Sequence, residues 1–185
     1  MKFTVDMLET EARMAELIPT ETLKYVGFED GMIFCDIGAG SGIFSFPAAE
    51  ISSNTVYALE LNDDLIGFMD KKKSELGLDH MQIKKVNSEN LPVNDDSCDV
   101  VMMTAVLHGI KRKVDLIKEI KRVLRSQGKL VIVEFHKKDQ VAGPPLEYRM
   151  SPLEVKDIIE KCDFELEKER VLGENNYLLS FKVKS

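Results

Sequence analysis

Three glycines and one acid stand together in DIGAGSG, residues 36–42, between an apolar run and a stretch that predicts a helix. Glycines let the backbone approach a ligand where any side chain would clash, although a tight strand-to-helix turn needs them too. A nucleoside triphosphate loop requires a lysine after its last glycine, and none follows Gly42. A dinucleotide loop has the spacing G-x-G-x-x-G, whereas Ile43 stands here at the third glycine. Asp36 would repel a pyrophosphate, so the loop favours a ligand with a positive charge or hydrogen-bond donors.

Two further polar positions follow predicted strands and suit the rest of such a ligand. Glu60 ends the second strand, where a carboxylate can accept both hydroxyls of a ribose, from NAD or from adenosine. Asn87 ends the third strand; its amide can meet the edge of an adenine ring, and Leu61 can cover the face of that ring. Asn87 is also a common residue in turns, and that interpretation stays open.

Candidate acid–base groups lie after the later strands. His108 is in the loop after the fourth strand, and Glu134 and His136 lie at the end of the fifth. Each can move a proton at a bound substrate, and each can equally be a structural side chain. Tyr148 and Arg149 follow a Gly-Pro-Pro stretch and can belong to a lid over the substrate, although packing within a loop explains them as well.

Helices that connect the strands are predicted from the helical spacing of apolar residues. Pro19 divides the first helix, Asn62 and Gly77 cap the third, and Gly128 is expected to end the fourth. Ser151 begins the last helix with a capping box. The predicted helices cover residues 4–26, 43–52, 62–76, 114–124 and the stretch after Ser151.

Apolar runs predict strands at 32–37, 55–59, 81–86, 99–103, 130–133, 164–172 and 177–183. The first five alternate with helices, which is typical of a parallel sheet covered on both faces. A turn at 173–176 joins the last two into a hairpin, so at least one strand is antiparallel. We therefore predict an α/β fold of three layers, with a seven-stranded, mostly parallel sheet and an antiparallel strand in a C-terminal hairpin.

Composition excludes several classes of protein. The chain has 185 residues, of which 44% are hydrophobic, enough for one domain with a substantial core. A formal net charge of −7 argues against sequence-independent binding to nucleic acid. The three cysteines are scattered, which suits reduced thiols better than a disulfide scaffold or a metal site. No stretch is long enough to span a membrane, and we expect a cytoplasmic protein.

Several stretches together resemble the class I S-adenosylmethionine-dependent methyltransferases, in particular the type 11 group around the ubiquinone/menaquinone-biosynthesis enzymes. They are DIGAGSG, VYALELN, VNSENLPVNDDSCDVVMMTAVLHGI and LIKEIKRVLRSQGKLVIVEF, and the likeness covers residues 30–184. The resemblance implies a Rossmann-like core over 29–185, covered by a helical segment over 1–28, in a single domain over 1–185. It also implies methyltransferase activity with S-adenosylmethionine as cofactor and S-adenosylhomocysteine as product.

The same resemblance assigns roles to residues. Those that would face the methionine portion and its ammonium are Asp36, Gly38, Ala39 and Gly40. Those that would hold the adenosine are Glu60 at the ribose hydroxyls, Leu61 at the adenine ring, Asn87 at the adenine amino group and Ser88 through its backbone N–H. Asn87 departs from the family, whose members often carry aspartate there. Thr104 and Ala105 would line the methyl-donor side of the pocket.

The acceptor and the catalytic residue stay open, with His108, His136 and Glu134 as candidates. We expect a small-molecule acceptor. A lightly covered pocket also leaves room for a large substrate or for completion by a second subunit, so a homodimer stays open. A non-catalytic S-adenosylmethionine-binding or partner-activating subunit is the alternative from another class. The glycine spacing disfavours a nicotinamide-dependent oxidoreductase.

Overall fold

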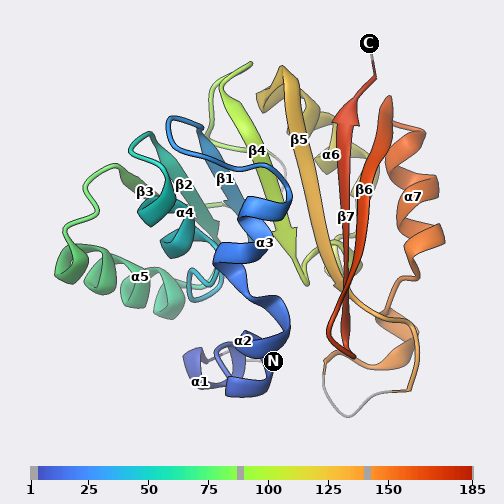
Figure 1. The fold of residues 1–185 in the computed structure, drawn as a ribbon, viewed down its shortest axis with the longest axis horizontal. Helices are drawn as coiled ribbons and strands as arrows, with labels where there is room; N and C mark the ends of the chain where they lie inside the picture. Colours follow the sequence, from blue (N-terminus) through green and yellow to red (C-terminus); the bar gives the residue numbers. More distant parts are fainter. Residues whose placement is uncertain (1–3, 87–89, 140–142, 185) are drawn as a thin grey trace.

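The computed structural model describes residues 4–86, 90–139 and 143–184. One sheet is built from seven strands, β1 (Phe34–Ile37), β2 (Val56–Glu60), β3 (Met81–Lys85), β4 (Cys98–Thr104), β5 (Leu124–Phe135), β6 (Phe164–Leu172) and β7 (Asn176–Val183). Their order is β3-β2-β1-β4-β5-β7-β6 (Figure 1). β7 is antiparallel to β5 and β6, and the other neighbouring pairs are parallel. The α/β class and the antiparallel terminal hairpin are therefore confirmed.

Helices cover both faces of this sheet (Figure 1). One buried cluster includes residues of α3 (Pro19–Tyr25), α4 (Ser45–Ile51) and α5 (Asp63–Leu76). The other includes residues of α6 (Lys113–Val123) and α7 (Pro152–Glu160). The three layers predicted from the sequence are those of the structure.

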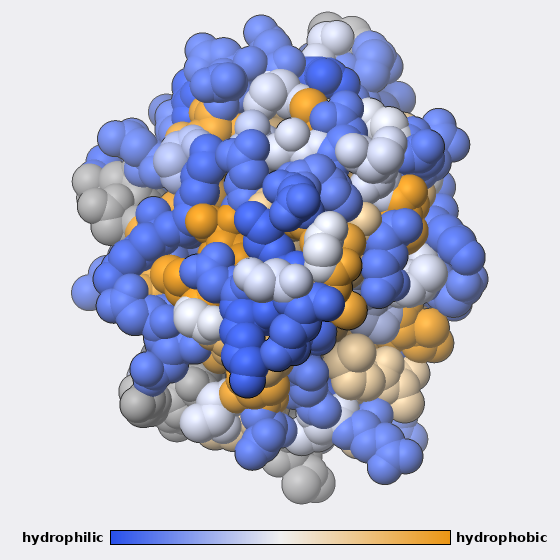
Figure 2. Space-filling model, turned by 90° about the vertical axis from the view of Figure 1, so that its left-hand side faces the viewer, coloured by the Kyte–Doolittle hydropathy of each residue, from blue (hydrophilic) through white to orange (hydrophobic). Residues whose placement is uncertain are grey.

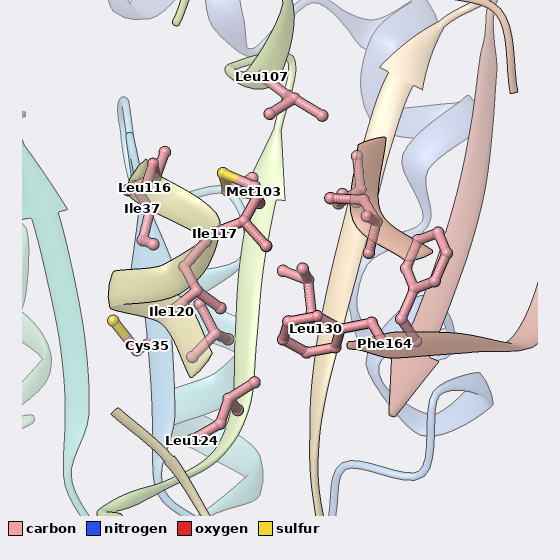
Figure 3. Close-up of a cluster of buried hydrophobic side chains, with 14 of the residues drawn as sticks. Cys35, Ile37, Met103, Leu107, Leu116, Ile117, Ile120, Leu124, Leu130 and Phe164 are labelled. Atoms are coloured by element: carbon pink, nitrogen blue, oxygen red, sulfur yellow. The ribbon is translucent and has the colours of Figure 1, made fainter. Parts of the chain in front are cut away.

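Successive residues of the central strands point to opposite faces. In β1, Phe34 belongs to the cluster under α4, and Cys35 to the cluster under α6. Figure 3 shows the second cluster, in which α6 directs Ile117 and Ile120 toward the strands that carry Cys35 and Met103. Because both faces bury apolar side chains, the strands read as continuous apolar runs.

The N-terminal segment forms three helices: α1 (Val5–Leu8), α2 (Glu11–Leu17) and α3. The break at Pro19 is confirmed, since Ile18 has a left-handed φ of 39° and Pro19 begins α3. A second break was not predicted: Thr10 caps α2 by accepting a hydrogen bond from Arg13 N at 3.3 Å. α1 and α2 lie beyond the carboxyl ends of the parallel strands (Figure 1).

The expected role of Gly128 was wrong. α6 ends at Val123 and β5 begins at the next residue, so Gly128 lies inside the strand. A Cβ there would lie 2.9 Å from the carbonyl oxygen of Arg125 and 3.0 Å from that of Cys98. The β4–β5 register shifts beside it, between Cys98 and Val100. The glycine therefore permits close backbone approach at an irregularity in the sheet.

Three predicted helix ends are confirmed. Asn62 Oδ1 accepts a hydrogen bond from Asp64 N at 2.9 Å, and Gly77 ends α5 with a left-handed φ of 67°. Ser151 and Glu154 form the predicted capping box at the start of α7. These ends depend on neighbours in the sequence, which is why the sequence identifies them.

The face on the β3 side of the molecule is mainly hydrophilic, with hydrophobic residues in separated patches (Figure 2). None of the helices in the described ranges is long and apolar enough to cross a membrane. Cys35, Cys98 and Cys162 are all buried and unpaired. Within the same ranges, no three histidine, cysteine or acidic side chains are close enough together to hold a metal ion.

Candidate active site

A cavity of about 640 Å³ lies at the carboxyl ends of β1, β2, β4 and β5. β2 and β3 lie on one side of β1, whereas β4 and β5 lie on the other, and a sheet binds ligands at such a reversal of order. The predicted site residues that line this cavity are Asp36, Gly38, Ala39, Gly40, Glu60, Thr104, Ala105 and His108.

The residues that line the cavity do not include three predicted site residues, Leu61, Glu134 and His136. Leu61 is 64% exposed. Asn87 and Ser88 fall outside the described residues. His136 is not in the cavity wall either; its ring packs against that of Tyr177, with centroids 5.3 Å apart, and burial lowers its pKa.

The glycine loop after β1 has a backbone that other residues rarely adopt. Gly38 has φ +69°, and a Cβ there would lie 2.5 Å from Cγ2 of Val106. Gly42 has φ +85°, and a Cβ there would lie 2.6 Å from the ring of Phe46. Both positions therefore need glycine for conformation and for space. The loop packs against Val106 in the turn after β4, and Gly38 and Gly40 line the cavity without side chains.

Asp36 is a buried carboxyl at the base of the cavity, only 2% exposed. Burial raises its pKa to about 7, and the nearby charge of Glu60 acts in the same direction. The hydroxyl of Ser45 donates to Asp36 Oδ2 at 2.7 Å and partly offsets the shift. A cationic ligand group beside Asp36 would favour the ionised form and lower this pKa.

Glu60, at the end of β2, already accepts three backbone hydrogen bonds. Gly40 N donates to Oε2 at 2.7 Å, while Leu61 N and Asn62 N donate to Oε1 at 2.7 and 2.9 Å. A carboxylate has about four acceptor positions, so about one remains. A ribose that bound through both hydroxyls would therefore have to share or displace one backbone donor. The bond to Gly40 also connects the ends of β1 and β2.

His108 and Glu134, predicted independently, form a pair. Glu134 is 1% exposed near the end of β5, and its Oε2 lies 2.8 Å from His108 Nδ1. Its Oε1 accepts a hydrogen bond from the backbone N–H of His108 at 3.1 Å. The carboxylate thus keeps the ring proton on Nδ1 and leaves Nε2 as the nitrogen that can accept a proton. This is the arrangement of a general base with an orienting carboxylate.

Several residues of the cavity wall were not predicted from the sequence. α1 and α2 contribute Leu8 and Arg13, the β6–β7 turn contributes Asn175, and Phe135 and Pro144 come from the end of β5 and the segment after it. Leu8, Arg13 and Asn175 belong to no quoted motif, because their role depends on where α1, α2 and the hairpin pack. Phe135 ends one of the quoted stretches and Pro144 lies in the Gly-Pro-Pro stretch, but neither was predicted to line a site.

Arg149, one of the two lid candidates, packs within its loop. It is 6% exposed, and its guanidinium donates to the carbonyl oxygens of Pro144 and Lys138 at 2.7 and 2.9 Å. Tyr148 is 59% exposed. Arg149 therefore holds the Gly-Pro-Pro segment, which lines the cavity.

Three buried side-chain atoms have no hydrogen-bond partner among the described residues: Arg13 Nε, Ser41 Oγ and Thr104 Oγ1. All three residues line the cavity. Buried polar groups are nearly always satisfied in folded proteins. Their concentration at one place indicates that this cavity receives polar groups of a ligand.

Glu16 fastens the N-terminal segment over the cavity. Its Oε1 accepts from Glu174 N at 3.2 Å and from Asn175 Nδ2 at 2.6 Å. Its Oε2 accepts from Asn175 N at 3.3 Å and from Asn176 Nδ2 at 2.9 Å. One carboxylate in α2 thus receives four donors from the β6–β7 turn.

Glu16→Ala is expected to loosen α1 and α2 without unfolding the sheet, because these four bonds cross between the two segments. We expect the local free energy of opening to fall by about 1–3 kcal/mol. Hydrogen exchange should become faster in residues 5–17 and stay unchanged in β4 and β5. Glu21→Ala is the matched control, since exposed Glu21 pairs with Lys24, three residues along the same helix, at 3.2 Å. Unchanged exchange in 5–17 would contradict this role.

Comparison with known proteins finds a family that matches most of the chain. A family model described as a methyltransferase domain matches residues 28–174. A demethylmenaquinone methyltransferase of Oceanobacillus iheyensis is 25% identical over 116 residues, which are 62% of this chain and 49% of that protein. A ubiquinone/menaquinone biosynthesis C-methyltransferase of Blochmanniella pennsylvanica is 30% identical over 108 residues, covering 57% of this chain and 42% of its own length. The chain thus matches less than half the length of either relative.

Solved structures share the fold. A S-adenosylmethionine-dependent methyltransferase from Aquifex aeolicus superimposes with a TM-score of 0.89 at 24% identity, covering 97% of this chain and 98% of its own. The [4+2]-cyclase SpnF superimposes with a TM-score of 0.78 at 15% identity, over 91% of this chain and 81% of its own. A protein named as a methyltransferase and one named as a cyclase thus share this fold, and the reaction has to be argued from the site.

Proposed function

The chain belongs to the class I methyltransferase-domain family, and from this premise we propose that it transfers a methyl group from S-adenosylmethionine to a small-molecule acceptor. One observation carries the proposal: a single cavity combines a buried carboxyl beside a glycine loop with a histidine oriented by a buried glutamate. The first suits an ammonium-bearing cofactor, and the second suits an acceptor that must lose a proton.

The residues of the β1–β2 half fit the cofactor. Asp36 would hold the ammonium, the backbone of the glycine loop would lie along the methionine portion, and Glu60 would bind the ribose. Ser41 and Thr104 offer buried hydroxyls that lack partners among the described residues. When bound, S-adenosylmethionine supplies a methyl group on a sulfonium, already activated toward a nucleophile. The protein therefore has to align the reactants and exclude water.

His108 would act as the general base. Its Nε2 can accept the proton that an acceptor O–H or N–H loses. Glu134 would hold the ring in the orientation that exposes Nε2 and would stabilise the imidazolium that results. α1, α2 and the segment over 143–145 line the cavity and would keep water from the reacting atoms. This pair at the cavity favours catalysis over a purely ligand-binding subunit.

A small acceptor is supported by the shape and lining of the cavity. Its volume of about 640 Å³ lies within the range of small-molecule sites, about 300–1,000 Å³. The β5 half is walled by Phe135, Pro144 and Pro145, flat apolar surfaces that suit a ring. The two relatives described above are named for quinone biosynthesis, and an acceptor with a ring agrees with those names.

Calorimetry and a labelling assay test this function. We expect S-adenosylhomocysteine to bind with micromolar affinity and NAD not to bind. Incubation with labelled S-adenosylmethionine and an extract of cells lacking the protein should move label into the small-molecule fraction. Binding of NAD without a response to S-adenosylhomocysteine would overturn the cofactor assignment. Label in protein or RNA instead would overturn the acceptor class.

Cofactor binding should release protons below neutral pH. Without ligand the pKa of Asp36 is about 7, and a bound ammonium would lower it. Below pH 7, binding therefore has to remove a proton, and affinity should rise by up to about tenfold per pH unit toward pH 7, then level off. Calorimetry of S-adenosylhomocysteine binding in buffers of different ionisation enthalpy measures the released protons. Affinity that stays constant from pH 5.5 to 8 would contradict the role of Asp36.

A further inference from the structure

Arg13 is a cation inside the cavity that the proposed reaction has not yet used. It lies on α2, and among the described residues that line the cavity it is the only lysine or arginine. Its Nε is buried and has no hydrogen-bond partner among those residues. A guanidinium presents five donors in a planar fork that matches a carboxylate. Its natural partner is therefore an anion, and no described side chain supplies one by direct contact.

The position of Arg13 places it on the acceptor side. α1 lies over the glycine loop, since Leu8 Cδ1 is 3.2 Å from where a Cβ would stand at Gly40. Arg13, further along the segment, has its Cζ 5.9 Å from the centre of the Phe135 ring on β5. Burial lowers the pKa of Arg13, and the charge of Glu134 partly offsets this effect. Arg13 thus lies in the same half of the cavity as the His108–Glu134 pair.

The acidic side chains in the wall disfavour an anion, and Arg13 offsets them. Besides Asp36 and Glu60 the wall includes Glu16, whose carboxylate is held by four donors. Asp36 and Glu60 line the β1–β2 half, and two carboxylates would repel an anion that entered beside them. A guanidinium in the opposite half attracts an anion and holds it away from those carboxylates. The hydrogen bonds would be charge-assisted and, in a fork geometry, bidentate.

From this placement we propose that the methyl acceptor carries a carboxylate, or an equally acidic group, which Arg13 binds. The inference rests on the proposed function, because it divides the cavity into a cofactor half and an acceptor half. A small aromatic acid is the ligand class that these walls fit, with its ring against the apolar wall of Phe135 and the prolines and its anionic group at Arg13. Arg13 is then a specificity-determining residue, and His108 acts at a different atom of the acceptor.

Benzoate and benzamide are the probes, since they share a ring and differ in charge. Calorimetry or NMR titration of the full chain, with and without S-adenosylhomocysteine, should show benzoate binding at least about 10-fold more tightly than benzamide. Arg13→Met should remove that preference, weakening benzoate by about 10- to 100-fold while benzamide is unchanged, and Arg13→Lys should restore part of it. Arg170→Met is the matched control, because Arg170 stacks on Tyr25, 5.0 Å from its ring centre, and does not line the cavity.

A second arm separates the acceptor from the cofactor as the source of the carboxylate. S-adenosylhomocysteine carries a carboxylate, whereas 5′-methylthioadenosine does not. We expect Arg13→Met to bind both as the wild type does. Selective loss of S-adenosylhomocysteine would assign Arg13 to the cofactor and overturn the inference, as would equal or undetectable binding of the two benzene probes. Failure of both adenosyl ligands to bind the wild type would instead count against the proposed function. The comparison of benzoate with benzamide would still test the role of Arg13, because it does not need an adenosyl ligand.

Discussion

Asp36→Asn is expected to weaken binding of S-adenosylhomocysteine by about 100-fold or more, because it removes the buried charge that would pair with the ligand ammonium. Asparagine keeps the size of the side chain and can still meet the hydroxyl of Ser45, which lies 2.7 Å from Asp36 Oδ2. The loss should therefore come from charge and not from a rearranged loop. Calorimetry at pH 8 measures it.

The same variant should be at least as stable as the wild type. The folded-state pKa of Asp36 is about 7, against 3.8 for an aspartate in an unfolded chain. Between these values the folded protein holds a proton that the unfolded chain has released, so stability falls as pH rises and the penalty is complete above pH 7. A shift of this size corresponds to a penalty on the order of 4 kcal/mol, which asparagine avoids. Thermal unfolding from pH 4 to 8 should show a smaller decline for the variant.

Asp99→Asn is the matched control for this prediction. Asp99 accepts a hydrogen bond from Ile33 N at 2.7 Å and pairs with Arg125 at 2.7 Å, and it does not line the cavity. The control should lose stability and keep its affinity for S-adenosylhomocysteine, the opposite of the change expected for Asp36→Asn. Equal affinity in the two variants would mean that the cofactor ammonium lies elsewhere.

His108→Gln is expected to lower methyl transfer by about 10²- to 10⁴-fold, the usual contribution of a general base. Affinity for S-adenosylhomocysteine should stay within about threefold of the wild type, because His108 lies on the acceptor side. The measurement is the initial rate of label transfer into the extract that the wild type labels. His80→Gln is the control, since the His80 ring hydrogen-bonds to the carbonyl oxygen of Ala49 at 2.9 Å and His80 is not in the cavity wall.

Glu134→Gln tests how His108 is held. The amide can donate to Nδ1, which would move the ring proton to Nε2 and remove the base without moving the ring. The rate should fall by an amount similar to that of His108→Gln, and the two losses should not add in the double variant. Nitrogen NMR of the ring reports the tautomer directly. A wild-type rate in either variant would mean that methyl transfer does not use His108 as its general base.

Most of the fold was predictable because its signals are local. Asn62, Gly77 and Ser151 act on backbone groups within a few residues, and the apolar runs of the strands reflect burial on both faces. The prediction that Gly128 ends a helix was wrong, because the sequence does not distinguish a glycine that ends a helix from one that permits close approach of two strands. Its contact with the carbonyl oxygen of Cys98 exists only once β4 and β5 are paired.

By itself, the sequence predicted Asp36, the glycine loop and Glu60, the residues of the β1–β2 side of the cavity that we propose for the cofactor. Asp36 and Glu60 lie at the carboxyl ends of β1 and β2, and the glycine loop follows β1. The carboxyl ends of adjacent parallel strands meet at one edge of a sheet. Only the tertiary structure decided the acceptor half. Glu134 reaches His108 across 26 residues of sequence, and Glu16 binds Asn176 across 160. Arg13 meets Phe135 only because α2 packs over the end of β5, and such packing depends on the shape of the whole assembled surface, which no short stretch of residues specifies.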